Sequence, residues 1–146
     1  MNLSSEQSHD RVAANEHGVL ATLHAARGAD LVPVVYTVVD GHVGVPVDLV
    51  KPKASTRLQR ERNLAADPRA TLLIEHWDRD DWSALWWVRT RLHWLGAGMT
   101  ESAAASELAE RMADRLAERH TQDRDFPFVR VLVFRIEGMT GWSAER

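Results

Sequence analysis

The sequence predicts an α+β fold, mainly β with helices, built around a six-stranded antiparallel sheet that closes into a barrel. Three observations predict it. Segments with strand-type patterns follow one another along most of the chain, an Asp-Gly pair joins two of them as a hairpin, and one long amphipathic helix interrupts the series. A chain of 146 residues is expected to form a single domain, residues 1–146, with its own hydrophobic core.

The first part of the chain is expected to form one helix and three strands. Residues 5–17 form a short helix, which the glycine that follows brings to an end. Residues 18–25 form the first strand. Residues 31–39 form a buried second strand because β-branched residues dominate it, and its proline lies near the start, where a lost backbone donor matters least. The Asp-Gly pair then makes a two-residue turn into the third strand, residues 42–48.

The rest of the chain is expected to add two helices and three strands. A Thr-x-x-Gln capping pattern at residues 56–59 begins a helix that ends at residue 66, before an Asp-Pro pair. Residues 69–77 form the fourth strand. Residues 85–95 form the fifth strand, because apolar side chains on one face alternate with mostly basic ones on the other. An amphipathic helix covers residues 101–120, and residues 128–138 form the last strand.

Composition excludes several classes of function. The absence of cysteine rules out disulfides, thiolate metal sites and a cysteine nucleophile, and the seven histidines lack the spacings of a metal site. A net charge of -3 argues against nucleic acid as the main partner. No apolar stretch approaches the ~20 residues of a membrane span, and no secretion-signal pattern is present, so we expect a cytoplasmic protein.

The segment VDLVKPKAST, residues 47–56, is the most informative local feature. Its Lys51 and Lys53 are the only lysines in the chain, whereas the other sixteen basic residues are arginines. In the extended backbone that Pro52 favours, both ammonium groups project to one side and repel each other unless an anion lies between them. A helix start follows directly, with Arg57 and Arg60 on its first turns. These residues fit a phosphate site, but lysines that protect an edge strand from aggregation remain an alternative.

Residues 47–89 resemble the pyridoxamine-phosphate-oxidase-like split β-barrel superfamily, and most closely its deazaflavin-dependent oxidoreductases. The residues that carry the resemblance are Asp48, Lys51-Pro52-Lys53, Leu58, Asn63, Asp67-Pro68, Asp81-Trp82 and Leu85-Trp86-Trp87-Val88-Arg89. Residues 31–41 and 141–144 also look like family segments. The resemblance implies a six-stranded antiparallel split β-barrel of the FMN-binding-protein type. It also implies a homodimer whose cofactor, coenzyme F-420 or flavin mononucleotide (FMN), lies in a groove at the subunit interface.

The resemblance also implies which residues bind the cofactor. Lys51, Lys53 and Arg57 would bind its phosphate, and the helix start would add two further donors, Ser55 and Thr56. The strand around residues 34–37 would line the ring, including Val35 and Tyr36. Tyr36 is the only tyrosine of the chain and a candidate hydrogen-bond or proton donor, with a buried structural role as the alternative.

Five of the six tryptophans are crowded into the fourth and fifth strands and the loop between them. Packing in the core or in a subunit interface is the first explanation for each, because aromatic side chains bury large areas. A flat ring system also needs apolar walls, so Trp77 and Trp87 are candidates for contact with the cofactor. Arg89 and Arg91 share one face of their strand, where they either pair with a carboxylate such as Glu75 or hold an anionic tail of a cofactor or substrate.

The predicted function is hydride transfer between coenzyme F-420 and a small conjugated organic substrate. Two alternatives stay open: an FMN-dependent oxidase or reductase on the same barrel, and a non-catalytic dimeric module that sequesters a cofactor or another ligand. Three departures from the family pattern bear on the cofactor and substrate: Asp30 in place of a histidine, Trp77 in place of a tyrosine, and the bulky run 90–94 where a glycine is usual. If that run closes the groove, the chain is a dimeric scaffold.

Overall fold

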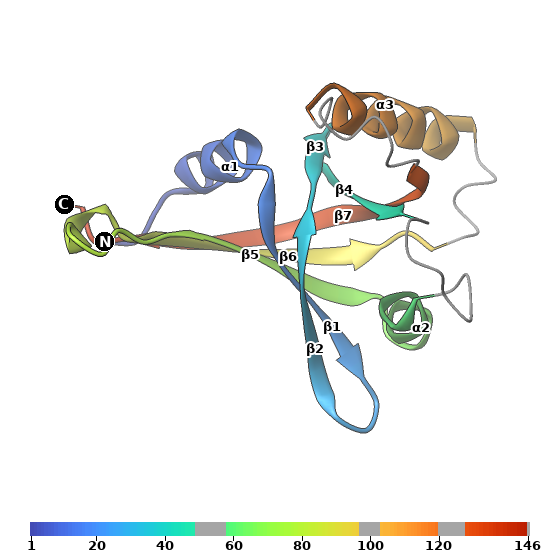
Figure 1. Ribbon diagram of the computed structural model, residues 1–146, viewed down its shortest axis with the longest axis horizontal. Coiled ribbons are helices and arrows are strands. Elements are labelled where there is room, and N and C mark those ends of the chain that lie inside the picture. The colour runs from blue at the N-terminus through green and yellow to red at the C-terminus, as the bar shows by residue number, and fades with distance from the viewer. Residues whose placement is uncertain (49–57, 97–102, 120–127, 146) are drawn as a thin grey trace.

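The computed structural model describes residues 1–48, 58–96, 103–119 and 128–145, and these form a strongly curled antiparallel sheet flanked by helices (Figure 1). The helices are α1 (Ser5–Ala14), α2 (Gln59–Ala66) and α3 (Ala103–Arg119), with a short 3-10 helix, η1 (Trp82–Ala84). The strands are β1 (His17–His24), β2 (Gly28–Val35), β3 (Thr37–Val39), β4 (His42–Asp48), β5 (Arg69–His76), β6 (Trp86–Trp94) and β7 (Phe128–Ser143). They lie in the order β2-β1-β5-β6-β7-β4-β3, and all neighbours are antiparallel.

The segment predicted as one strand, residues 31–39, belongs to two strands, so the sheet has seven strands and not the predicted six. β2 pairs with β1 at one edge of the sheet, and β3 pairs with β4 at the other edge. Only Tyr36 separates them in the chain, and its backbone N–H donates to the Glu16 carbonyl at 2.9 Å instead of joining a ladder. Because one continuous segment forms both edges, the sheet must curl on itself into a half-barrel.

The Asp-Gly hairpin is confirmed. Asp40 and Gly41 both have positive φ, 48° and 73°, as a two-residue turn of this handedness requires, and Val39 pairs with His42 across it. The last strand was predicted too short, because β7 continues to Ser143 and keeps pairing with β6 beyond its glycines.

The two short helices begin or end at other residues than predicted. α1 ends at Ala14, where Asn15 turns to an extended backbone that leads into β1. α2 begins at Gln59 with Leu58 as its N-cap, so the Thr-x-x-Gln pattern does not mark its start. Instead, the Glu61 carboxylate accepts the backbone N–H of Leu58 at 3.4 Å, which satisfies one donor at the helix start.

The inside of the curled sheet is filled by one hydrophobic core. Its largest members, Tyr36, Phe134, Leu20 and Leu72, have no exposed surface, and α1 contributes Val12. Fully burying one such side chain contributes about 1.5–3 kcal/mol to stability.

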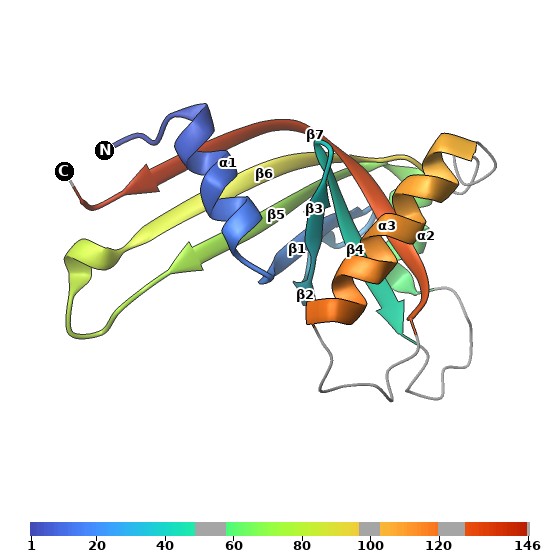
Figure 2. The same ribbon diagram turned by 90° about the horizontal axis from the view of Figure 1, so that it is seen from above.

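α3 crosses β3, β4 and β7 and buries Met112 and Leu116 against them (Figure 2). Gly44 allows this close approach, since a Cβ there would lie 2.6 Å from the sulfur of Met112. None of the helices in the described ranges is long and apolar enough to cross a membrane.

Candidate functional site

A groove of about 350 Å³ lies between β2 and the start of α2. Its apolar wall is formed by Leu31, Val32 and Leu58, and its polar wall includes Thr22, Arg27, Asp30, Gln59 and Arg60. Leu58 is the first described residue after the Lys-Pro-Lys segment. The chain therefore enters α2 from that segment at the rim of the groove.

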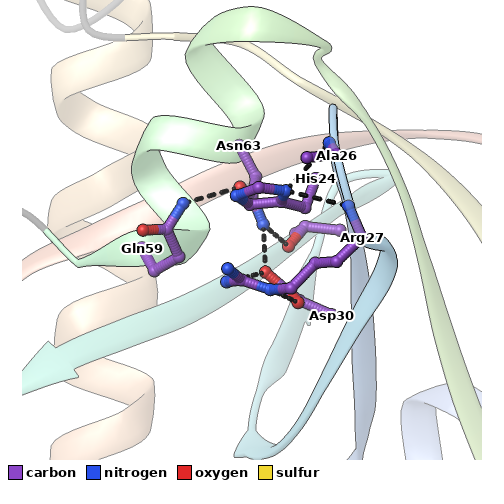
Figure 3. A network of polar contacts seen from close by, with 7 residues as sticks. His24, Ala26, Arg27, Asp30, Gln59 and Asn63 are labelled. Atoms are coloured by element: carbon purple, nitrogen blue, oxygen red, sulfur yellow. Dashed lines mark hydrogen bonds and ion pairs between the residues drawn. The ribbon is translucent and has the colours of Figure 1, made fainter.

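A buried asparagine fixes the position of α2 over the β1–β2 hairpin (Figure 3). Asn63 is 3% exposed, and its Nδ2 donates to Thr22 Oγ1 at 3.0 Å and to Asp30 Oδ2 at 2.8 Å. Its Oδ1 accepts a hydrogen bond of 3.0 Å from Gln59 Nε2. Both hydrogens of the amide and its oxygen are thus used, so the side chain has one satisfied orientation.

Asp30 is a carboxylate in the polar wall of the groove that bonds to both Arg27 and Asn63. Arg27 grips it with two parallel hydrogen bonds, from Nε to Oδ1 at 2.8 Å and from Nη2 to Oδ2 at 2.9 Å. The hydrogen bonds from Arg27 and then from Asn63 lower the pKa of Asp30 to about 2. Asp30 is therefore a carboxylate at neutral pH, and its acceptor oxygens serve to hold the wall of the groove together.

An ion pair between Glu61 and Arg130 attaches α2 to β7. Glu61 is 6% exposed and forms an ion pair with Arg130 on β7, next to its hydrogen bond with the backbone of Leu58. α2 is thus held on one side by the Asn63 contacts and on the other by a buried carboxylate. The groove has rigid walls, as a ligand site needs.

Four of the six tryptophans, Trp77, Trp82, Trp86 and Trp87, lie around the turn between β5 and β6, and they are called the aromatic cluster here. Trp77 and Trp82 are 52% and 67% exposed and meet edge to face, with ring centroids 6.3 Å apart. Trp86 stacks with His76 at 6.3 Å. Trp87 lies under the guanidinium of Arg89, 4.6 Å from its ring centroid.

Within one chain this aromatic cluster is remote from the groove. β5 begins at Arg69, close behind α2, and ends at His76, directly before Trp77. Its eight residues separate the two ends by about 23 Å at the usual strand rise. The structure therefore does not bring Trp77, Trp87 and Arg89 together with the α2 groove inside a single subunit.

Of the other predicted cofactor residues, two do not line the groove and five lie outside the described ranges. Tyr36 is completely buried, and its hydroxyl donates to the Val12 carbonyl at 2.6 Å, which is the structural role that the sequence left open. Val35 is half-buried at the end of β2 and does not line the groove. The phosphate-binding candidates Lys51, Lys53, Ser55, Thr56 and Arg57 lie outside the described residues.

Some residues that shape the groove were not predicted as site residues. Arg27 had no distinguishing motif, and Gln59 was noted only for the capping pattern. Arg60 was noted beside Arg57 at the helix start, as part of the phosphate hypothesis. Asn63 was noted as part of the family pattern and Asp30 as a departure from it. The bulky run 90–94 does not line this groove within one chain. Among the described residues, no cluster of histidines and carboxylates could hold a metal ion.

The fold is shared with solved flavin-binding proteins. A FAD-binding protein from Mesorhizobium loti superposes with a TM-score of 0.70 at 16% identity, over 97% of this chain and 95% of that chain. An FMN-binding protein from Syntrophomonas wolfei gives a TM-score of 0.67 at 16% identity, over 97% and 88%. A protein provisionally assigned as a pyridoxamine 5′-phosphate oxidase, from Corynebacterium glutamicum, gives 0.54 at 14% identity, over 98% of both chains.

The same fold also occurs in a heme-binding protein from Mycobacterium smegmatis, with a TM-score of 0.62 at 21% identity, over 97% of this chain and 59% of that chain. A scan against models of protein families finds no match, and neither does a search of curated protein sequences. The chain thus has the fold of FAD- and FMN-binding, pyridoxamine-phosphate-oxidase-like proteins. The deazaflavin branch rests on the sequence motifs alone.

Proposed function

We propose that this chain is an oxidoreductase that binds a phosphate-bearing flavin or deazaflavin in the α2 groove. Coenzyme F-420 is the cofactor that the Lys-Pro-Lys and Leu-Trp-Trp-Val-Arg motifs favour, and FMN is the one that the fold neighbours favour. The observation that carries the proposal is the groove itself. It has an apolar wall that suits a planar ring, and Leu58 in that wall follows Lys51, Lys53 and Arg57 in the sequence.

The described residues of the groove fit such a cofactor by position and by charge. Leu31, Val32 and Leu58 offer apolar surface, and Arg60 places a positive charge beside the anionic part of the cofactor. When bound, a flavin or deazaflavin supplies the hydride-transfer chemistry. The protein's part is to orient the ring and exclude water, which agrees with the absence of any nucleophile–base pair among the described residues of this groove.

The remaining predicted site residues fit this function in a homodimer. In a two-fold dimer, both subunits use the same interface. If one end of the first subunit contacts the opposite end of the second, the second makes the same contact with the first. Leu31 in the groove is 68% exposed, and Trp82 in the aromatic cluster is 67% exposed. Large apolar side chains this exposed mark surfaces that bind another protein or a ligand. We propose that the aromatic cluster of the second copy, with Trp77, Trp87 and Arg89, closes the groove over the cofactor.

Cofactor titration of the purified protein tests the binding proposal. Quenching of tryptophan fluorescence by F-420, FMN and FAD measures the three affinities. Lys51→Ala and Lys53→Ala are each expected to weaken binding more than tenfold, since a charge-assisted hydrogen bond contributes about 1.5–3 kcal/mol. Arg62→Ala is the matched control, because it removes one positive charge from the exposed face of α2, outside the groove. Equal affinities in all three variants would return the lysines to the edge-protection role.

Oligomeric state tests the dimer. A double variant, Trp77→Ala with Trp82→Ala, is expected to dissociate the dimer in light scattering after gel filtration and to weaken cofactor binding in parallel. A monomeric native protein that binds the cofactor with the same affinity would refute the shared site.

A non-catalytic binding module is the second candidate, and one observation favours it. The only tyrosine, the candidate proton donor, is buried with its hydroxyl bonded to a backbone carbonyl, so the described groove contains no tyrosine donor. A heme-binding protein has the same fold. Tight binding without turnover of any conjugated acceptor under steady-state conditions would select this candidate over the oxidoreductase.

A further inference from the structure

A second groove, of about 500 Å³, lies across β1, β5, β6 and β7. Ala21, Thr71, Arg91 and Gly138 are aligned by the strand registers as a row across these four strands. Their sequence neighbours, including Leu20 and Leu72, point into the core. Because side chains alternate between the faces of a strand, the row lies on the outer face of the sheet.

Arg91 contributes the uncompensated charge of this outer groove. It is exposed, and it forms no ion pair or hydrogen bond with any part of the chain that the structure describes. Its guanidinium lies against the backbone of Gly138, where a Cβ would come within 2.9 Å of Nη2. The glycine therefore leaves room for the guanidinium beside the backbone of β7.

The other charges around the outer groove are matched. Arg69 pairs with Asp67 at 2.7 Å, and Glu137 pairs with Arg135 at 2.7 Å. In each pair the arginine lowers the pKa of the carboxyl group, which is therefore charged and committed to its own arginine at neutral pH. The described lining thus carries a net positive charge that comes from Arg91.

An apolar surface lies beside this charge. Leu23 is 37% exposed and lines the groove together with Ala21. A guanidinium next to an exposed aliphatic side chain matches a ligand with an anionic head and an apolar body. Arginine suits a carboxylate in particular, since its planar fork donates two parallel hydrogen bonds.

We propose that the outer groove binds a small organic carboxylate with an apolar body, whose carboxylate contacts Arg91 and whose body contacts Leu23 and Ala21. This site is separate from the α2 groove and does not depend on the proposed cofactor function. The two grooves lie on opposite faces of β1, since Thr22 lines the first and its neighbours Ala21 and Leu23 line the second. One chain thereby has room for a cofactor and for an acidic organic ligand at the same time.

Titration of the full chain without cofactor, followed by NMR, tests the outer groove. The probes are hexanoate, acetate, which lacks the apolar body, and 1-hexanol, which lacks the charge. Hexanoate is expected to shift the Arg91 Nε–Hε resonance and the Leu23 methyl resonances along one saturable curve. Acetate and 1-hexanol are expected to bind at least about tenfold more weakly, because each lacks one of the two contributions. Equal binding of acetate and hexanoate would overturn the proposal.

Two variants and a matched control identify the residues. Arg91→Gln is expected to weaken hexanoate binding about tenfold or more. Gly138→Ala keeps the charge but occupies the place of the guanidinium, so it is expected to weaken binding as well. Arg62→Gln makes the same charge change on the exposed face of α2, outside the outer groove, and is expected to leave the affinity unchanged. Native-like affinity in Arg91→Gln, or an equal loss in Arg62→Gln, would refute the assignment.

The cofactor arm separates this site from the proposed function. Arg91→Gln is expected to bind F-420 or FMN with native affinity. If a saturating cofactor displaces hexanoate and the displacement depends on Arg91, the outer groove is part of the cofactor site, and the proposal of a separate site is wrong. Failure of all cofactor binding would refute the proposed function and leave the hexanoate result standing.

Discussion

Replacing Asn63 with alanine removes three hydrogen bonds at once from the junction between α2 and the β1–β2 hairpin. The bonds with Thr22 and Gln59 are between neutral groups and contribute about 0.5–1.5 kcal/mol each, and the bond to the Asp30 carboxylate contributes about 1.5 kcal/mol, the low end for a charged partner that keeps its arginine. Alanine has the better helix propensity, which returns about 0.6 kcal/mol. The expected net loss of unfolding free energy is about 2–4 kcal/mol.

Urea denaturation followed by circular dichroism measures this loss. Asn15→Ala is the matched control, because its Nδ2 donates a single hydrogen bond, 2.7 Å to the Arg11 carbonyl, at the exposed end of α1. We expect that control to cost about 0.5–1 kcal/mol. A value for Asn63→Ala no larger than for Asn15→Ala, at unchanged denaturant slope, would refute the view that the asparagine network holds α2 in place. The same variant is expected to weaken cofactor binding, since α2 forms one wall of the groove.

Three further changes have expected outcomes. Tyr36→Phe removes a buried hydroxyl bonded to the backbone of α1, so thermal unfolding should show a loss of about 1 kcal/mol while cofactor affinity stays native. The pKa values of Asp30 and Asp67 are lowered to about 2 by their arginines, so their stabilisation is complete above about pH 4 and is lost as the pH falls toward 2, which acid titration at fixed salt measures. Gly44→Ala places a Cβ 2.6 Å from the sulfur of Met112, so it should lower the unfolding free energy in urea by about 1–3 kcal/mol. An alanine introduced at an exposed position has no such overlap and should change it much less.

The sequence predicted most of the sheet because its signals were local. The Asp40-Gly41 turn needs only two residues, and the alternation along β6 was visible in nine. The division of the predicted strand 31–39 had no such signal. It depends on the hydrogen bonds that Tyr36 makes with Glu16 and Val12, which lie 20 and 24 positions away in the chain. A run of β-branched residues cannot show where its pairing partner changes.

The candidate site was predicted in part for the same reason. The Lys-Pro-Lys segment, a local pattern, gave the phosphate hypothesis, which stays a prediction because it lies outside the described residues. The groove beside it depends on Asn63, which contacts Asp30 and Thr22 from 33 and 41 positions away, and no spacing rule detects such a pair. Trp77 and Trp87 were candidates for the same site because the chain alone does not show that β5 separates them from it.

Asp30 in the wall of the groove restricts what the groove can do chemically. Asp30 accepts two hydrogen bonds from Arg27 and one from Asn63, and its pKa of about 2 leaves it ionised throughout the physiological range. An acid this strong is a poor base near neutral pH, since catalysis of proton transfer is best when the pKa lies near the working pH. The described groove can therefore orient a bound molecule and hold fixed charges beside it, and any hydride chemistry there must come from a bound cofactor.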